Sequence, residues 1–367
     1  MKLKRILGWS AGVILLALVV AALAAYFTSS NTCDRPAAVP GHPMKAIVYC
    51  DYGSPDVLKL EDVEKPTPGD DQVLIKVRAA SVNPYDWHLM RGMPYIVRLQ
   101  AGLRKPKVIR LGVDFAGKVE AVGRNVTRFK PGDEVFGGST GAFAEYVAVR
   151  EDRAAVVPKP PNLSFEQAAS VPIAAITALQ ALRNRGKVQP AQKVLINGAS
   201  GGVGTFAVQI AKSFGAEVTG VCSTRNVEMV RSIGADHVID YTKEDFTKGG
   251  QRYDVLLDNV GNRLLSECRS VLNPQGKYIM IGGESGRWLD PLPRMIAARV
   301  MARFVRQEMG MMLAHVTKED LTTLGDLMQS GKVTPVIDRR YKFSEVPAAI
   351  RYLEQGHARG KVVITFE

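Results

Sequence analysis

Apolar and polar positions follow two different patterns along this chain. From Met44 to Tyr49 and from Val73 to Val77, apolar side chains alternate with polar ones or form short runs between turn residues, which is typical of β-strands. From residue 194 to residue 281, short apolar runs alternate with amphipathic stretches, which indicates repeated strand and helix units. The β alternation returns between Arg340 and Phe366. The sequence therefore predicts an α/β protein in which a β-rich part flanks a doubly wound parallel sheet.

The strand and helix units begin with a glycine-rich turn, Ile196 to Gly204, of sequence I-N-G-A-S-G-G-V-G. An apolar residue recurs at every fourth position from Phe206 to Phe214, which predicts a helix directly after the turn. Small residues at a helix N-terminus let a pyrophosphate reach backbone N–H groups. A glycine triplet alone is compatible with a flexible turn, but here strand, turn, helix and next strand follow in order. We expect the turn to bind a dinucleotide through Ala199, Ser200, Gly201, Gly202, Val203 and Gly204.

The choice of cofactor depends on the end of the second predicted strand. An Asp or Glu about twenty residues beyond the glycine turn would hold the ribose 2′-OH of NAD, whereas this chain has Ser223 and Arg225 there. A hydroxyl and a guanidinium suit a 2′-phosphate, which predicts NADPH; the alternative is that Arg225 is a solvated loop residue. Asn259 and Gly282 follow two later strands, at the carboxyl edge where such a sheet binds its ligand.

The composition, 46% hydrophobic over 367 residues, is that of a folded protein large enough for two domains. A net charge of +12 favours anionic ligands or anionic surfaces. The chain has no recognisable nucleic-acid-binding motif, so a nucleic-acid partner is not expected. Its four cysteines lie far apart without a C-x-x-C pair, which predicts isolated buried thiols rather than a metal knuckle or a disulfide framework.

Residues 6–27 are almost without polar side chains and follow the basic residues Lys2, Lys4 and Arg5. A helix rises about 1.5 Å per residue, so this segment predicts an N-terminal transmembrane helix and a single-pass membrane protein. The run Ala22-Leu23-Ala24 resembles a signal-peptidase site, which makes a cleaved signal peptide the competing interpretation. The basic cluster predicts a cytoplasmic N-terminus with the enzyme body on the far side. Because NADPH is normally cytosolic, the side of the membrane stays open.

Four motifs in this order resemble the medium-chain dehydrogenase/reductase superfamily, specifically its zinc-independent quinone oxidoreductase-like branch. They are S-V-N-P-Y-D-W at residues 81–87, G-V-D-F-A-G at 112–117, P-G-D-E-V-F-G at 131–137 and A-S-G-G-V-G at 199–204. The resemblance implies a GroES-like catalytic domain wrapped around a Rossmann domain, with the active site in the cleft between them. We expect a membrane anchor and tether at residues 1–43, the catalytic domain at 44–166, the NADP-binding domain at 167–314 and a return to the catalytic domain at 315–367.

The resemblance also implies roles for single residues. Asn83 stands at the start of the active-site loop, where its amide can donate to a carbonyl oxygen or to the nicotinamide ribose. His88 replaces a Tyr or Lys of relatives, and its imidazole can donate a proton or hydrogen bond; a surface-loop histidine is the equal alternative. Thr177 matches a position whose hydroxyl approaches the nicotinamide carboxamide, Tyr241 one that joins the 2′-phosphate pocket, and Lys361 a C-terminal cofactor contact.

Zinc is not expected. Zinc alcohol dehydrogenases need three protein ligands and an open position, and this chain has Asn83, Val113 and Ile173 at the corresponding places. The four-cysteine structural lobe of those enzymes is missing as well. The resemblance therefore implies a site without metal.

The predicted reaction is hydride transfer from NADPH to a small apolar quinone or α,β-unsaturated carbonyl. Such an acceptor stabilises its own developing negative charge, as it must where the protein supplies only hydrogen bonds and fixed dipoles. The alternative is a membrane-tethered NADPH-binding scaffold or sensor without turnover.

Residues 291–312 form a basic amphipathic segment. Arg299, Arg303 and Arg306 share one helical face and Ile296, Val300 and Phe304 another. The segment can lie on an anionic membrane, cap the substrate cleft or pack at the subunit interface of a homodimer.

Overall fold

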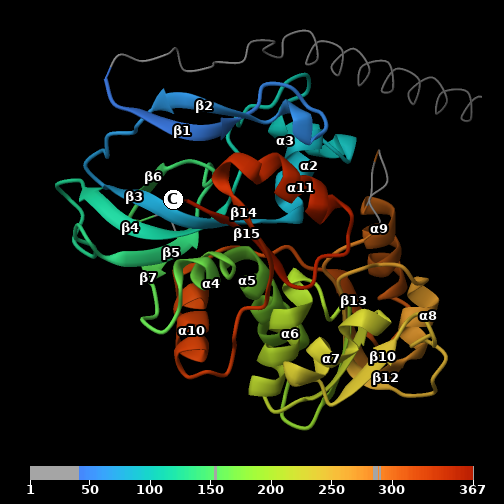
Figure 1. The fold of residues 1–367 in the computed structure, drawn as a ribbon. Helices are drawn as coiled ribbons and strands as arrows, with labels where there is room; N and C mark the ends of the chain where they lie inside the picture. The colour runs from blue at the N-terminus through green and yellow to red at the C-terminus, as the bar shows by residue number, and fades with distance from the viewer. Residues whose placement is uncertain (1–40, 153–154, 284–287, 289–290, 367) are drawn as a thin grey trace, which may run out of the picture.

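The computed structural model describes residues 41–152, 155–283, 288 and 291–366, and Figure 1 shows how they are arranged. A β-rich part occupies the upper half of this view, and a parallel sheet with its helices occupies the lower half. The C-terminal strand lies in the upper part, because it pairs with a strand from early in the chain. This is the α/β architecture that the sequence predicts, with a GroES-like part and a Rossmann-like sheet.

The upper part contains a two-stranded antiparallel sheet and a larger sheet of order β14-β15-β3-β4-β5-β7, in which β6 also pairs with β3. Its strands are β1 (Pro43–Val48), β2 (Lys59–Glu64), β3 (Gln72–Val82), β4 (Asp114–Val122), β5 (Glu134–Gly138), β6 (Tyr146–Arg150), β7 (Ala155–Pro158), β14 (Ile337–Lys342) and β15 (Lys361–Thr365). β15 runs antiparallel to β3, with Val362 opposite Val82. The first residue of β15 therefore lies beside the end of β3, next to Asn83.

The lower sheet is parallel and has the order β10-β9-β8-β11-β12-β13. Its strands are β8 (Lys193–Asn197), β9 (Glu217–Cys222), β10 (His237–Asp240), β11 (Tyr253–Asp258), β12 (Leu272–Met280) and β13 (Glu308–Met311). Val194 and Ile196 pack into one apolar core and Leu195 into another, so β8 is buried on both faces. A continuous apolar run is the expected signature of such a strand. The strand order changes direction between β8 and β11, which is where doubly wound sheets bind ligands.

Ten helices and five shorter helical segments are described along with these strands. The helices are α2 (Pro84–Arg91), α3 (Arg98–Ala101), α4 (Phe165–Ala169), α5 (Pro172–Gln180), α6 (Gly202–Ser213), α7 (Val227–Ser232), α8 (Leu265–Ser270), α9 (Leu292–Met301), α10 (Lys318–Gln329) and α11 (Val346–Glu354). The shorter segments are η1 (Pro55–Val57), η2 (Tyr95–Val97), η3 (Ala181–Gly186), η4 (Thr224–Asn226) and η5 (Phe343–Glu345).

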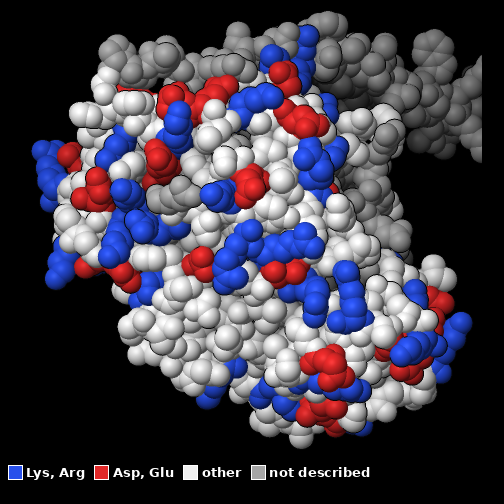
Figure 2. Space-filling model, viewed as in Figure 1, with Lys and Arg blue, Asp and Glu red and all other residues white. Residues whose placement is uncertain are grey.

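The two parts meet at the glycine-rich turn. Gly201, just before α6, forms a parallel bridge with Gly360, just before β15. Figure 2 shows Lys and Arg side chains gathered across the middle of the molecule, along the boundary between the upper and lower parts. A positive surface at this boundary favours an anionic ligand there.

The expected single-pass membrane location is corrected by the structure. Among the helices of the described ranges, none has both the length and the apolar character needed to cross a membrane. The segment that prompted the expectation, residues 6–27, lies outside the described residues.

Two further expectations differ from the structure. The basic segment does not continue as one helix, because α9 ends at Met301 and Arg303, Phe304 and Arg306 lie beyond it. The isolated-thiol expectation holds for Cys222 and Cys268, which are buried and free. It is wrong for Cys50, which is disulfide-bonded.

Candidate active site

The glycine-rich turn leaves open space at the N-terminus of α6. Gly198 has a φ of +79°, which favours glycine, and a side chain at Gly204 would place its Cβ 2.1 Å from the Gly198 carbonyl oxygen. Both positions thus require glycine for the turn itself. A Cβ at Gly201 would meet only the Gly198 oxygen, at 3.6 Å. The space over Gly201 is therefore available to a ligand that approaches the first N–H groups of α6.

The residues predicted to contact a 2′-phosphate come together at the ends of β9 and β10. Ser223 and Arg225 follow β9, and Tyr241 follows β10 and donates its backbone N–H to the carbonyl oxygen of Cys222 at 3.0 Å. Arg225 is exposed, and its Nη2 donates to the carbonyl oxygen of His357 at 2.8 Å. That bond ties the loop before β15 to the end of β9.

Asn226 connects the glycine turn to the end of β9, although it was not among the site residues predicted from the sequence. Its Nδ2 donates to the hydroxyl oxygen of Ser200 at 3.0 Å and to that of Ser223 at 3.2 Å. The side chain is buried, so these bonds hold a residue of the glycine turn and a residue after β9 in fixed relative positions. An amide four residues after a predicted strand end is a weak signal by itself, which explains why sequence reasoning missed it.

Two buried side-chain oxygens in the described part of the chain have no hydrogen-bond partner, and both lie at this carboxyl edge. They are Oδ1 of Asn226 and Oδ1 of Asn259. The other end of the Asn259 amide is occupied, since Nδ2 donates to the carbonyl oxygen of Asn197 at 3.0 Å. Unpaired buried acceptors are costly, so these oxygens suit a ligand that brings hydroxyl or amide donors. Ribose hydroxyls and a carboxamide, as in a nicotinamide dinucleotide, fit that requirement.

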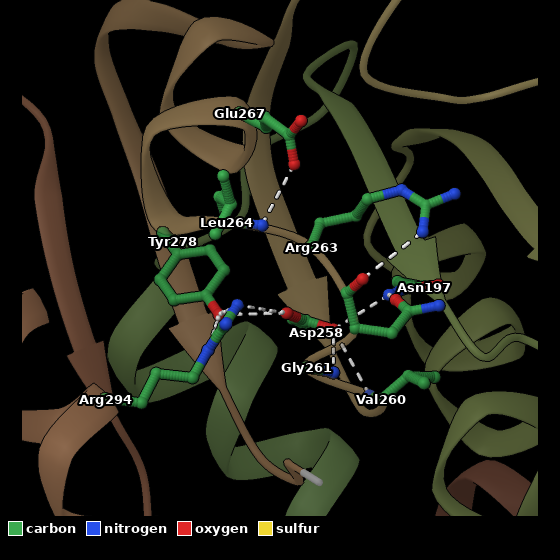
Figure 3. A network of polar contacts seen from close by, with 10 residues as sticks. Asn197, Asp258, Val260, Gly261, Arg263, Leu264, Glu267, Tyr278 and Arg294 are labelled. Atoms are coloured by element: carbon green, nitrogen blue, oxygen red, sulfur yellow. Dashed lines mark hydrogen bonds and ion pairs between the residues drawn. The ribbon is translucent and has the colours of Figure 1, made fainter.

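A fully buried carboxylate, Asp258, fixes this edge of the sheet (Figure 3). Its oxygens accept from Nδ2 of Asn197 at 2.9 Å, from the hydroxyl of Tyr278 at 2.8 Å and from the backbone N–H of Gly261 at 2.8 Å. Nη2 of Arg294 lies 3.4 Å from Oδ2. The network therefore joins β8, β11, β12 and α9, and it holds the loop that carries Asn259.

Gly282 closes the other side of that loop. A Cβ at this position would lie 2.3 Å from the carbonyl oxygen of Asn259. The backbone after β12 thus packs directly on the backbone after β11. Of the predicted cofactor contacts, Asn259 and Gly282 are brought together after β11 and β12, next to the point where the strand order reverses.

On the upper side of the boundary, Asn83 is buried in a polar network. Its Oδ1 accepts a hydrogen bond of 2.6 Å from Nζ of Lys361. Its Nδ2 donates to Oδ2 of Asp114 at 2.9 Å, with the carbonyl oxygen of Ser81 at 3.4 Å. The two ends of the amide are thereby distinguished, because an ammonium only donates and a carboxylate only accepts. Both N–H groups of the amide are directed at protein oxygens.

Asp114 anchors this network from the start of β4. It is fully buried and accepts from the hydroxyl of Ser81 and from the backbone N–H of Ile173, both at 3.0 Å. The Lys361 ammonium lies 3.5 Å from Oδ2 of Asp114. Sequence reasoning quoted Asp114 within the G-V-D-F-A-G motif but assigned it no role. A carboxylate inside an apolar motif was the signal that could have found it.

A second carboxylate, Asp86, caps helix α2 from within the S-V-N-P-Y-D-W motif. Oδ2 accepts the backbone N–H of Asn83 at 2.8 Å, and Oδ1 accepts that of Gly112 at 3.0 Å. Burial raises the pKa of Asp86 to about 7, although the two backbone hydrogen bonds oppose the shift. Asp86 therefore links the backbone around Asn83 to the loop before β4.

Lys361 supplies the buried cation of this site. The residue is 3% exposed, and burial lowers its pKa while the charges of Asp114 and Asp86 oppose the shift. Its side chain also reaches the glycine turn, since a Cβ on Gly202 would lie 3.2 Å from Cδ of Lys361. The structure thus places Lys361 between the glycine turn and Asn83.

His88 lies outside this network, near the end of α2. Its ring stacks on Trp87 with centroids 3.6 Å apart, and Nδ1 lies 2.7 Å from the carbonyl oxygen of Met93. A carbonyl only accepts, so Nδ1 carries the proton and the neutral ring leaves Nε2 as an acceptor. Burial lowers the pKa of His88, while the bond to Met93 opposes this. Nε2 can therefore donate a proton only in the minor, protonated form.

Thr177 and the Asn83 network share one helical turn. The Thr177 hydroxyl donates to the carbonyl oxygen of Ile173 at 2.7 Å. The N–H of Ile173 donates to Asp114, so the start of α5 contacts the network around Asn83. Thr177 is buried in α5.

The residues present do not fit a catalytic zinc ion. Val113 and Ile173 offer no side-chain ligand, and the one amide oxygen, on Asn83, already accepts from the Lys361 ammonium. A second cation at that oxygen would be repelled. Over the described residues, no cluster of three or more His, Cys, Asp or Glu side chains has a metal-binding arrangement.

Two family models match the chain. An alcohol dehydrogenase GroES-like domain matches residues 69–161, and a zinc-binding dehydrogenase model matches residues 233–364. Quinone-oxidoreductase QR1 of Triphysaria versicolor is 35% identical over 344 residues, which cover 88% of this chain and 99% of the relative. The NADPH-dependent alkenal/one oxidoreductase of Arabidopsis thaliana is 38% identical over 336 residues, covering 88% of this chain and 79% of the relative.

A solved structure, that of the quinone oxidoreductase from Coxiella burnetii, aligns with a TM-score of 0.77 and 33% identity. The alignment covers 89% of this chain and 100% of that chain. Both plant relatives are named as chloroplastic proteins. The chain therefore belongs to the medium-chain dehydrogenase/reductase superfamily of oxidoreductases, in its quinone oxidoreductase-like branch.

Proposed function

We propose that this protein transfers hydride from NADPH to a quinone or an α,β-unsaturated carbonyl without zinc. The observation that carries the proposal is the contact between the glycine turn and the upper part. There the Gly201–Gly360 bridge sets the open N-terminus of α6 beside the buried Asn83 and Lys361 pair. In this proposal residues 44–166 and 315–367 form the acceptor side, and residues 167–314 hold the nucleotide.

NADPH is proposed as the cofactor because the corner after β9 offers a hydroxyl, a guanidinium and a phenol from Ser223, Arg225 and Tyr241. No carboxylate directly follows β9 in the sequence, and that of Asp240, which ends β10, already accepts from the hydroxyls of Thr224 and Thr242. The unpaired oxygens of Asn226 and Asn259 would receive donors from the bound dinucleotide. When bound, NADPH supplies the hydride and its electrons. The Arabidopsis relative is NADPH-dependent by name.

The acceptor is proposed to be a quinone or an enone, the two classes that the relatives' names contain. The protein side offers the Asn83 amide, the His88 imidazole and the buried Lys361 ammonium, and the described residues hold no cluster of metal-ligating side chains. Such groups stabilise a partial charge by hydrogen bonds, which suits acceptors that delocalise the incoming electrons. Asn83 and His88 are the proposed acceptor-side residues, and Thr177 is proposed to contact the nicotinamide carboxamide.

The test is a screen of NADPH oxidation by the purified protein against quinones, enals, enones and simple aldehydes. Turnover should appear with quinones or enones, persist after dialysis against a chelator and be absent with simple aldehydes. NADPH binding without acceleration by any acceptor would contradict the enzyme and leave a nucleotide-binding scaffold. One equivalent of zinc lost together with turnover would contradict the metal-free chemistry.

A further inference from the structure

Lys361 contacts both halves of the proposed site, and the following inference rests on the proposed function. Its backbone begins β15 directly after Gly360, which bridges to Gly201 of the glycine turn. Its aliphatic stem packs against Gly202. Its ammonium ends at Oδ1 of Asn83, 2.6 Å away. The resemblance of the sequence assigned Lys361 to the cofactor, whereas these contacts direct its charge to the acceptor side.

The chemistry of the Asn83 amide explains why a cation is needed there. An amide has an acceptor end and a donor end of nearly the same shape, and only its partners decide which end points where. At Asn83 the Lys361 ammonium can donate only to the amide oxygen. The Asp114 carboxylate can accept only from the amide nitrogen. The ammonium also offsets the charge of Asp114, which is 0% exposed, so that an ionised carboxylate is tolerated in the interior.

We propose that Lys361 is a positioning residue for hydride transfer, which fixes the Asn83 amide and the start of α2 relative to the glycine turn. It acts through Asn83 and is not a direct binding contact for NADPH. Because the same side chain spans from Gly202 to Asn83, it sets the distance between the nucleotide and the acceptor side. Loss of the ammonium should therefore impair turnover at saturating NADPH and leave NADPH affinity nearly intact.

The test compares Lys361→Met with the exposed control Lys248→Met, using kcat at saturating NADPH and acceptor and the Kd of NADPH by fluorescence titration. Misplacement of a reacting group by about 1 Å costs on the order of 100-fold in rate. We expect Lys361→Met to lower kcat by about tenfold to 100-fold and to change the Kd of NADPH less than about threefold. Lys248→Met should match the wild-type protein.

Folding is controlled by a second variant, because Lys361→Met leaves the buried Asp114 without its cation. Lys361→Met combined with Asp114→Asn removes both charges and should fold, bind NADPH and turn over as slowly as the single variant. A double-mutant cycle with Asn83→Ala measures the coupling of the two residues in kcat, which a purely structural role of Lys361 would not produce. If Lys361 acts through Asn83, the double variant Asn83→Ala, Lys361→Met loses no more kcat than the worse single variant.

Two results would overturn the proposal. One is an unchanged kcat with an NADPH Kd raised about tenfold or more, since Lys361 would then be a cofactor contact. The other is wild-type turnover in the charge-free double variant. Failure of the proposed function looks different, because the wild-type protein itself would then show no acceptor-dependent NADPH oxidation.

Discussion

The ammonium of Lys361 lies 2.6 Å from the amide oxygen of Asn83, although 278 positions separate the two residues in the chain. The contact exists because β15 pairs with β3 and so returns the C-terminal segment to the end of β3. The same strand start bridges to the glycine turn. The contact between Asn83 and Lys361 therefore depends on the correct pairing of the chain end with the upper part and on its bridge to the lower part.

Asp114→Ala should destabilise the protein by about 3–5 kcal/mol, because it removes one partner of a buried ion pair. The carboxylate is 0% exposed and also accepts from Ser81 and Ile173, which would lose their partner. Urea unfolding at pH 7 measures the change. Asp326→Asn, at an exposed position, should stay within about 0.5 kcal/mol of the wild-type value. A loss below about 1 kcal/mol for Asp114→Ala would show that Lys361 does not depend on Asp114.

Arg225→Asp should weaken NADPH binding by about tenfold to 100-fold, or about 1.4–2.8 kcal/mol, and leave NADH binding unchanged or improved. The reason is that a carboxylate repels the 2′-phosphate and can accept from a ribose hydroxyl. Calorimetric titration of both nucleotides measures the effect. Arg269→Asp makes the same charge change at an exposed position on α8 and is the control. Equal wild-type affinities for NADPH and NADH would contradict the assignment.

His88→Ala should lower kcat by about tenfold to 100-fold while NADPH affinity changes little. Burial lowers the pKa of His88 from its ordinary value near 6.5, so the protonated form that can donate from Nε2 gains population only as pH falls below about 6.5. If His88 supplies a proton, wild-type kcat rises as pH falls through that window, and the variant lacks the rise. The control is His237→Ala, at a side chain 61% exposed. An unchanged kcat profile would remove His88 from the site.

Alanine substitutions at two glycines of the turn should affect different properties, namely stability at Gly204 and NADPH binding at Gly201. At Gly204 a Cβ would lie 2.1 Å from a carbonyl oxygen, so Gly204→Ala should cost about 1–3 kcal/mol of stability. At Gly201, where φ is −84° and the nearest atom is 3.6 Å away, alanine should be tolerated by the fold but raise the Kd of NADPH about tenfold. Thermal unfolding and nucleotide titration separate the two. Unimpaired NADPH binding by a folded Gly201→Ala protein would show that the ligand does not approach this turn.

The sequence by itself determined the features that depend on neighbouring residues. The apolar run at Val194 to Ile196 predicted a strand, and the glycines after it predicted a tight turn and a helix in that order. These features are local, because the spacing of apolar residues, the residue types of a turn and the start of a helix are each encoded within about ten residues. The same local information favoured an amphipathic helix within residues 291–312. It did not reveal that α9 stops at Met301.

Only the tertiary structure decided which polar groups meet. Asn83 and Lys361 were both candidates, but their contact and the central place of Asp114 come from the pairing of β15 with β3 and of β3 with β4. The tautomer of His88 depends on a carbonyl oxygen five residues away, beyond the end of α2. Asn226 acquires its role only where β9 brings it beside the glycine turn. The physical reason is that a buried polar side chain is defined by its partners, and partners brought together by strand pairing leave no periodic trace in the sequence.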